Sequence, residues 1–167
     1  ETAIPSSIRE ASIKVIEKGL LSLEKAPAKE AKGKASNIEL NADQKGAIDN
    51  VLSKKDGTTL IWGVTGSGKT EVYLKIIEEK LNEGCGAIVL VPEISLTPHL
   101  TERFEKRFPG LISVFHSDQK STDTRKAWLK SFLGQSRIAI GPRSALFAPI
   151  RNLGVVIIDE EHDGSYK

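Results

Sequence analysis

The sequence predicts an α/β protein whose mainly parallel sheet is flanked by helices. From about residue 38 onward, short apolar runs alternate with stretches of helical periodicity, the pattern of strand–helix–strand units. The runs at 87–91 and 155–158 contain no polar residue, as is typical of strands covered on both faces. A glycine-rich loop at 63–70 separates another apolar run from a helix, the context in which such loops are informative.

Composition places few limits on function. The 167 residues are 39% hydrophobic and 28% charged, which are ordinary values for one folded domain with a core. A net charge of +2 neither indicates nor excludes a nucleic-acid partner. The single Cys85 makes no disulfide framework or metal cluster, and no apolar stretch indicates a membrane span or signal peptide. We therefore expect a cytoplasmic protein without membrane contact.

The chain is expected to be a piece of a longer protein. It begins at Glu1, contains no methionine, and has an apolar run a few residues from its end. Residues 1–25 hold a short helical pattern and a weakly alternating stretch, which suit either the tail of a winged-helix-like module or an ordered leader. Residues 26–37 are poor in large apolar side chains and predict a linker. The main domain is expected from residue 38 to residue 167.

The first helix of this domain is predicted from Asn41 to about Lys54. Asn41 and Gln44, three positions apart, form a variant of the capping box. Gln44 therefore has two candidate roles. It caps its own helix, or it reads the edge of an adenine beside the glycine-rich loop.

The glycine-rich loop fits the phosphate-binding pattern of Gly, four free positions and Gly-Lys-[Ser/Thr]. A strand is predicted before it, at 58–62, and a helix after it, at 71–81. The glycines let backbone amides turn toward a phosphate chain, and the helix start adds positive charge. We expect Lys69 to reach the β- and γ-phosphates of ATP and the Thr70 hydroxyl to bind Mg²⁺. The predicted nucleotide contacts are Gln44, Gly63, Thr65, Gly66, Ser67, Gly68, Lys69 and Thr70.

Four further strands and two further helices complete the prediction. The strands are expected at 87–91, 112–115, 137–140 and 155–159, and the helices at 95–107 and 123–133. Ligands of parallel sheets bind at the carboxyl ends of the strands. The segments that follow those ends are the loop itself, Pro92-Glu93, His116, Gly141-Pro142-Arg143 and Asp159-Glu160.

The acidic pair after the last apolar run predicts hydrolytic chemistry. An apolar strand followed by acids indicates little by itself, but after a phosphate-binding loop it indicates a magnesium site. We expect Asp159 to hold Mg²⁺ opposite Thr70 and Glu160 to orient or deprotonate an attacking water. Such a pair suits hydrolysis better than transfer to a second substrate.

Asp159-Glu160-Glu161-His162 resembles the D-E-x-H box of superfamily 2 helicases. The wider run at 159–167 and three other stretches, at 62–73, 91–98 and 141–149, are similar to those of the replication-restart helicases of the primosomal protein N′ family. Together they span most of residues 38–167, and in this order they are specific. The resemblance implies a RecA-like P-loop NTPase lobe, incomplete here because the chain ends soon after the Walker B strand at 155–159.

The resemblance also implies roles for individual residues. It favours nucleotide contact for Gln44, and His162 would couple the nucleotide state to the DNA side. His99 and His116 receive no role. Pro142 departs from the family pattern, in which a small or hydroxylated residue is expected, so a DNA contact there is left open. The implied contacts with single-stranded DNA are Pro92, Glu93, Ile94, Ser95, Arg143 and Ser144.

The implied parent is an ATP-hydrolysing 3′→5′ helicase that acts on single-stranded and forked DNA in primosome assembly and replication restart. Its implied partners are primosome and single-strand-binding proteins, and its implied location is the nucleoid. This sequence lacks the second motor lobe with its arginine finger and the clustered cysteines that bind zinc in the family. We therefore expect zinc only in the parent, and weak nucleotide and DNA binding without efficient turnover here. The alternatives are another superfamily 2 translocase, a P-loop phosphotransferase, and a non-enzymatic module that binds DNA or a protein.

Overall fold

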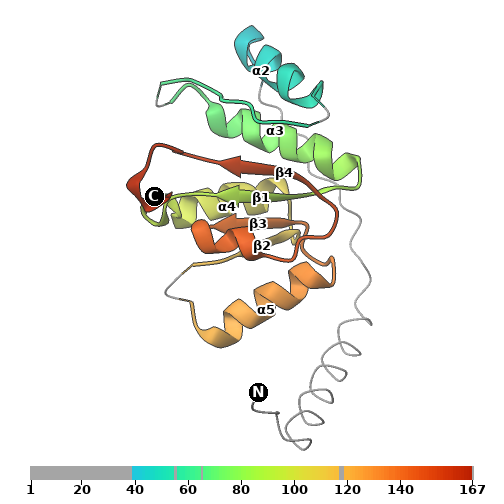
Figure 1. Ribbon diagram of the computed structural model, residues 1–167, viewed down its shortest axis with the longest axis vertical. Coiled ribbons are helices and arrows are strands. Elements are labelled where there is room, and N and C mark those ends of the chain that lie inside the picture. The colour runs from blue at the N-terminus through green and yellow to red at the C-terminus, as the bar shows by residue number, and fades with distance from the viewer. Residues whose placement is uncertain (1–38, 55, 65, 117–118, 167) are drawn as a thin grey trace, which may run out of the picture.

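The structure is a computed structural model that describes residues 39–54, 56–64, 66–116 and 119–166 (Figure 1). The module expected at 1–25 and the linker expected at 26–37 lie outside these residues. The described elements are, in chain order, α2 (Ala42–Leu52), α3 (Lys69–Asn82), β1 (Gly86–Leu90), the 3₁₀ helix η1 (Glu93–Ser95), α4 (Pro98–Arg107), β2 (Ile112–Val114), α5 (Ser121–Phe132), β3 (Ile138–Gly141), the 3₁₀ helix η2 (Arg143–Phe147), β4 (Leu153–Ile158) and the 3₁₀ helix η3 (Gly164–Tyr166).

The described strands form one parallel sheet in the order β2-β3-β1-β4. Leu90 at the end of β1 pairs with Gly141 on one side and Ile158 on the other, so three strands end at one level. The α/β class with a parallel sheet is confirmed. The register also brings the segments that follow β1, β3 and β4 to the same edge of the sheet, which is where a ligand of such a sheet is expected.

The strand predicted at 58–62 does not form. This segment is extended but has no ladder, so the described sheet has four strands where the sequence predicted five. Ile61 packs against the core, whereas Leu60 and Trp62 are 67% and 90% exposed. A strand requires a hydrogen-bonded neighbour as well as an alternating pattern. An extended segment anchored by one inward side chain gives the same pattern, and the prediction is therefore wrong here.

The helix predicted from Ser95 to Arg107 is divided. Thr97 caps α4, because its side chain accepts the Leu100 N–H at 3.2 Å, and Pro98 occupies the first turn. Proline suits that position, but it keeps the preceding residue out of the helical region, and Thr97 has an extended ψ of 156°. Ser95 consequently belongs to η1, a separate turn at the edge of the sheet.

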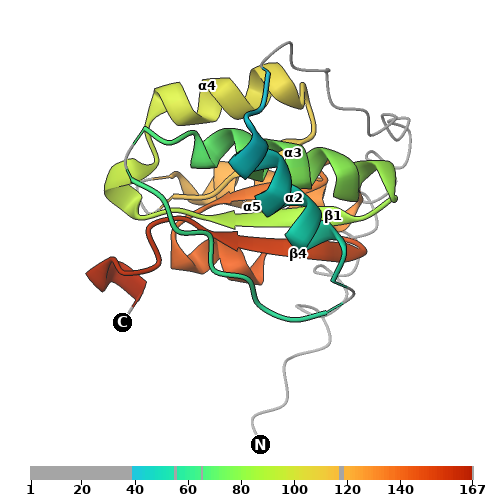
Figure 2. The same ribbon diagram turned by 90° about the horizontal axis from the view of Figure 1, so that it is seen from above.

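Helices cover both faces of the central strands. Side chains of β1 alternate between two apolar clusters, with Val89 in one and Ile88 in the other. The first cluster is closed by α3 and α4, and the second by α5 and η2 (Figure 2). At β4, Ile157 is buried in the first cluster, but Val156 and Ile158 remain 41% and 49% exposed. The elements α5 and η2 therefore do not cover β4.

Two ion pairs join α3 to α4. Arg107 Nη2 lies 2.6 Å from Glu78 Oε2, with both side chains 10% exposed, and Arg103 pairs with Glu71 nearer the start of α3. Arg107 lies near the end of α4 and Glu78 in the middle of α3. The pairs hold the helix that leaves the phosphate loop against the helix that follows η1.

Candidate active site

The phosphate loop connects the extended segment at 58–62 to α3. Gly66 and Gly68 have φ values of 81° and 83°, a region that side chains other than glycine rarely adopt. A Cβ atom on Gly63 would lie 2.7 Å from Ser67 Oγ, so a side chain at this position would require the Ser67 hydroxyl to move. Thr65 lies outside the described residues. α3 begins at Lys69 without a side-chain cap, as expected for a helix start whose amides are available to an anion.

Lys69 reaches back over the loop. Its Nζ donates to the carbonyl oxygens of Gly63 at 2.7 Å and Val64 at 3.1 Å. The ammonium group therefore lies inside the turn of the loop, where a phosphate chain in contact with the loop amides would meet it. The contact of Lys69 with the β- and γ-phosphates stays a prediction.

Gln44 makes contacts that suit both of its candidate roles. Its N–H donates to Asn41 Oδ1 at 2.8 Å, and its Oε1 accepts the Asn41 N–H at 3.0 Å, which completes a reciprocal capping box. Its Nε2 donates to the carbonyl of Ser67 at 3.1 Å. The capping role is confirmed, and the side-chain amide also lies against the phosphate loop.

Asp159 follows β4, and its carboxylate lies against α3. Tyr73 Oη donates to Asp159 Oδ1 at 3.2 Å, and the Glu160 N–H donates to the same oxygen at 3.1 Å. Tyr73 and Thr70 are three residues apart in α3 and so share one helical face. We therefore expect the Thr70 side chain on the side of α3 that faces Asp159.

The two tyrosines around Asp159 keep their protons at neutral pH. Burial, followed by the nearby Asp159 carboxylate, raises the pKa of Tyr73 far above its ordinary value. Burial and the same carboxylate raise the pKa of Tyr166 to about 12. Tyr166 Oη donates to the backbone carbonyl of Asp159 at 3.2 Å. Both hydroxyls therefore act as donors that fix Asp159, one through its side chain and one through its backbone.

Glu160 lies beside η1, in the segment that follows β1. Its backbone is in the left-handed region, with φ of 48°, and its carbonyl accepts the Asp163 N–H at 2.8 Å. Its Oε2 accepts a hydrogen bond from Ser95 Oγ at 3.2 Å. The carboxylate expected to act on water thus touches a residue expected to contact DNA.

The donor set fits Mg²⁺ held together with a nucleotide. In the parts of the chain that the structure describes, no three His, Cys, Asp or Glu side chains gather to hold a metal by themselves. Mg²⁺ commonly needs only one or two carboxylates when substrate phosphates complete its coordination. Asp159 offers Oδ2, which accepts no hydrogen bond from another described residue, and Thr70 offers its hydroxyl. No geometry of the ion itself follows from this arrangement.

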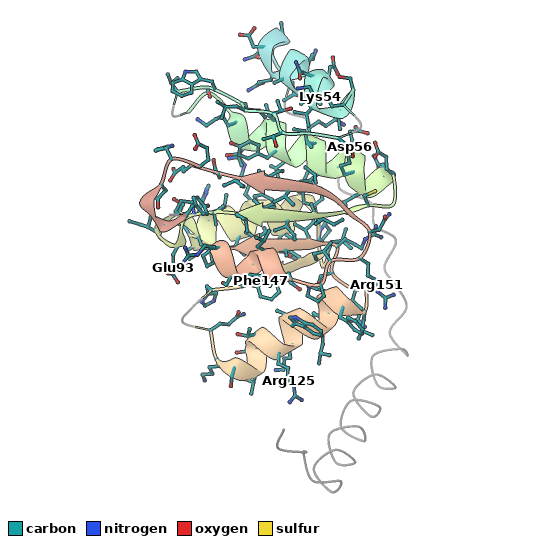
Figure 3. All side chains as sticks on the ribbon, viewed as in Figure 1. Lys54, Asp56, Glu93, Arg125, Phe147 and Arg151 are labelled. Carbon is teal, nitrogen blue, oxygen red and sulfur yellow. The ribbon has the colours of Figure 1, made fainter. Side chains whose placement is uncertain are left out.

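The two segments expected to track a DNA strand lie at the same edge. Pro92, Glu93, Ile94 and Ser95 form the first, in and before η1, and Arg143 and Ser144 begin η2. Figure 3 shows Glu93 at the end of the sheet where the strands terminate. Ile94 is 85% exposed, and Arg143 and Ser144 are also exposed. A Cβ on Gly141 would collide with the carbonyl of Phe115, so a close backbone approach precedes η2.

The expected coupling residue, His162, is exposed, and among the described residues no hydrogen bond joins it to either of these segments. Two contacts were missed from the sequence. Tyr73 is three residues after Thr70, and that helical spacing could have identified it. The Ser95–Glu160 contact joins residues 65 positions apart, and nothing in the sequence indicated it.

The phosphate loop, the acidic strand end and two exposed segments lie at one edge of a parallel sheet, an arrangement typical of RecA-like P-loop lobes. The chain matches the DEAD/DEAH box helicase family over residues 41–167. It belongs to that family, and the RecA-like architecture expected from the sequence agrees with it.

Within the family, the chain is similar to replication restart proteins named PriA. It is 49% identical to the protein from Synechocystis over 130 residues, which are 77% of this chain and 16% of the relative. It is 45% identical to the Bacillus subtilis protein over 138 residues, which are 80% of this chain and 17% of the relative. For Haemophilus influenzae, the identity is 48% over 79% of this chain and 18% of the relative. The chain thus spans less than a fifth of the length of these relatives.

A solved structure supports the fold. The UvsW helicase from bacteriophage T4 superposes with a TM-score of 0.59, covering 89% of this chain and 51% of that chain at 15% identity. At this identity, the likeness concerns the fold alone. Among the described residues, no helix is both long and apolar enough to span a bilayer.

Proposed function

We propose that this chain is part of the first motor lobe of a replication-restart helicase that hydrolyses ATP while moving 3′→5′ on single-stranded DNA. The observation that carries the proposal is the contact between Tyr73 and Asp159. It ties the helix of the phosphate loop to the acidic end of β4, which supports a hydrolytic site formed by these two parts of the chain. The PriA relatives support the assignment to replication restart.

The proposed reaction is in-line attack of water on the γ-phosphate of ATP. Lys69 binds the β- and γ-phosphates, the loop amides bind the phosphate chain, and Gln44 reads the adenine. Glu160 orients the water and accepts its proton. Thr70 and Asp159 would hold Mg²⁺, which neutralises charge on the transferred phosphoryl group when it is bound.

The proposed DNA grip is independent of base sequence. Arg143 and Ser144 in η2, together with the segment from Pro92 to Ser95, contact phosphates of one strand. Contacts of this kind weaken as salt rises, because each one releases counterions from the nucleic acid. His162 is proposed to couple the nucleotide state to this strand.

The longer protein is proposed to act on forked DNA with primosome and single-strand-binding proteins, in the cytoplasm at the nucleoid. It is also proposed to carry a zinc site outside these residues. The isolated chain binds nucleotide and DNA weakly without efficient turnover, because the arginine finger comes from a second lobe and contributes roughly 10³–10⁵ in rate. Hydrolysis by this chain at a rate near that of an intact helicase contradicts that last point.

The proposed contacts with DNA are tested by measuring the affinity for a labelled oligo(dT), by fluorescence anisotropy, at increasing salt concentrations. Arg143→Ala is expected to weaken binding and to reduce the slope of log K against log salt by about 0.7, the loss of one phosphate contact on a single strand. Arg125→Ala is the matched control, because Arg125 projects from α5, away from the edge where Glu93 lies (Figure 3). Equal effects of the two substitutions contradict the proposed strand path.

Another superfamily 2 translocase remains the second candidate, because UvsW shares the fold. Release of free phosphate supports hydrolysis in either case. Transfer of the phosphate to a small molecule would instead favour a phosphotransferase.

A further inference from the structure

The contact between Ser95 and Glu160 joins the two functions proposed for the sheet edge. Ser95 ends η1, in the segment that is proposed to follow a DNA strand, and Glu160 is the carboxylate proposed to act on water. Ser95 Oγ donates to Glu160 Oε2 at 3.2 Å.

Both partners of this contact have a fixed backbone. The Ser95 N–H donates to Pro92 O at 2.8 Å, which closes the turn of η1. On the other side, the Glu160 N–H donates to Asp159 Oδ1 at 3.1 Å, and the Glu160 carbonyl accepts the Asp163 N–H at 2.8 Å. Only the side chains can change partners without a change of the turn or the strand end.

A serine hydroxyl carries one proton and can donate it to one acceptor at a time. A carboxylate and a phosphodiester are both anions that only accept hydrogen bonds. The Glu160 carboxylate and a DNA phosphate at Ser95 therefore compete for the same proton. The two negative charges also repel each other when both groups lie beside the Ser95 hydroxyl.

We propose that Ser95 is a positioning residue that holds Glu160 when no strand is bound and releases it when a DNA phosphate takes the hydroxyl. The inference rests on the proposed function, since it uses its roles for Ser95 and Glu160. Released from Ser95, the Glu160 carboxylate turns toward the attacking water. Hydrolysis thereby becomes dependent on an occupied strand path, and by reciprocity Glu160 weakens strand binding.

The test is a double-mutant cycle of oligo(dT) affinity without nucleotide, so it does not depend on turnover. Glu160→Ala frees the Ser95 hydroxyl and is expected to tighten binding. Glu161→Ala, the exposed acidic neighbour, measures the general effect of removing a negative charge. We expect Glu160→Ala to increase oligo(dT) affinity about threefold to tenfold more than Glu161→Ala does, which is the range of one hydrogen bond.

This additional gain in affinity is expected to disappear when Ser95 is also replaced by alanine. It is expected to persist when Ser95 is replaced by threonine, which keeps the hydroxyl. Equal effects of Glu160→Ala and Glu161→Ala, or an additional gain that survives Ser95→Ala, overturn the inference while leaving the proposed function intact. A wild-type chain that binds neither oligo(dT) nor ATP overturns the proposed function first.

A rate measurement with protein in excess over ATP gives a second readout. Ser95→Ala is expected to raise the rate of hydrolysis in the absence of DNA. The ratio of the rate with oligo(dT) to the rate without it is then expected to be close to one. Stimulation equal to that of the wild type contradicts the inference. Hydrolysis by Glu160→Gln at the wild-type rate contradicts instead the role of Glu160 in the proposed function.

Discussion

The Tyr73 hydroxyl donates a hydrogen bond to Asp159 Oδ1 across 3.2 Å, and the Glu160 N–H donates to the same oxygen. One carboxylate oxygen is therefore engaged by two donors, while Oδ2 accepts no hydrogen bond from the other described residues. The two donors fix the rotation of the carboxylate. If Asp159 holds Mg²⁺ as proposed, this arrangement leaves Oδ2 as the oxygen that binds the cation, because partners of a metal ligand set its orientation.

Replacement of Tyr73 by phenylalanine tests this relationship. Tyr73→Phe keeps the buried ring but removes one donor to Asp159. The magnesium-dependent part of nucleotide affinity is expected to fall about tenfold, as for other partners of metal ligands, whereas affinity measured in EDTA stays the same. Calorimetric titration with and without Mg²⁺ provides the comparison. Tyr166→Phe is the control, because Tyr166 donates to the Asp159 backbone carbonyl; equal losses in both variants contradict the assignment.

The two roles of Gln44 can be separated with two substitutions. Gln44→Glu keeps a side-chain acceptor for the Asn41 N–H but removes the Nε2 donor that reaches Ser67 O. We expect helix stability to be nearly retained and ATP affinity to fall. Gln44→Ala also removes the capping acceptor, and its further loss is expected to be about 1 kcal/mol of unfolding free energy. Denaturant unfolding and ATP titration measure the two effects. Unchanged ATP affinity in Gln44→Glu leaves capping as its function.

The buried ion pair between Glu78 of α3 and Arg107 of α4 is expected to be important for stability. Glu78→Ala leaves Arg107 buried without its carboxylate partner, and two other guanidinium nitrogens of Arg107 already lack a hydrogen-bond partner among the described residues. Loss of about 3 kcal/mol in unfolding free energy is expected. Glu102→Ala removes an exposed pair with Lys106 and should leave the urea midpoint almost unchanged. Similar midpoints for both variants would show that the buried pair contributes little.

Local signals in the sequence predicted local structure well. The cap formed by Asn41 and Gln44, the turn glycines at 66 and 68, and the start of α3 all depend on residues within one turn of chain. The same kind of signal at Thr97 and Pro98 was available for the start of α4 and was overlooked. The segment 58–62 differs, because its state depends on whether another strand pairs with it, and no local pattern contains that information.

Contacts between distant residues account for what the sequence did not reveal. Tyr73 and Asp159 are 86 positions apart, and Ser95 and Glu160 are 65 apart. Their meeting depends on the strand order β2-β3-β1-β4, which places β4 next to β1. The sequence predicted that the carboxyl ends of the strands share an edge, but the parallel class alone does not specify which strands are neighbours.

The most direct test of the account is nucleotide titration of this chain and its Lys69→Ala variant in the presence of Mg²⁺. Lys69 Nζ lies within the phosphate loop, where it donates hydrogen bonds to Gly63 O and Val64 O, and its removal deletes the charge that is proposed to bind the phosphates. Lys80→Ala, at the far end of α3, controls for the loss of a lysine from this helix. The account predicts ATP binding by the wild type and the Lys80 variant and a loss of about tenfold or more for Lys69→Ala. Indistinguishable affinities for Lys69→Ala and the wild type would contradict it.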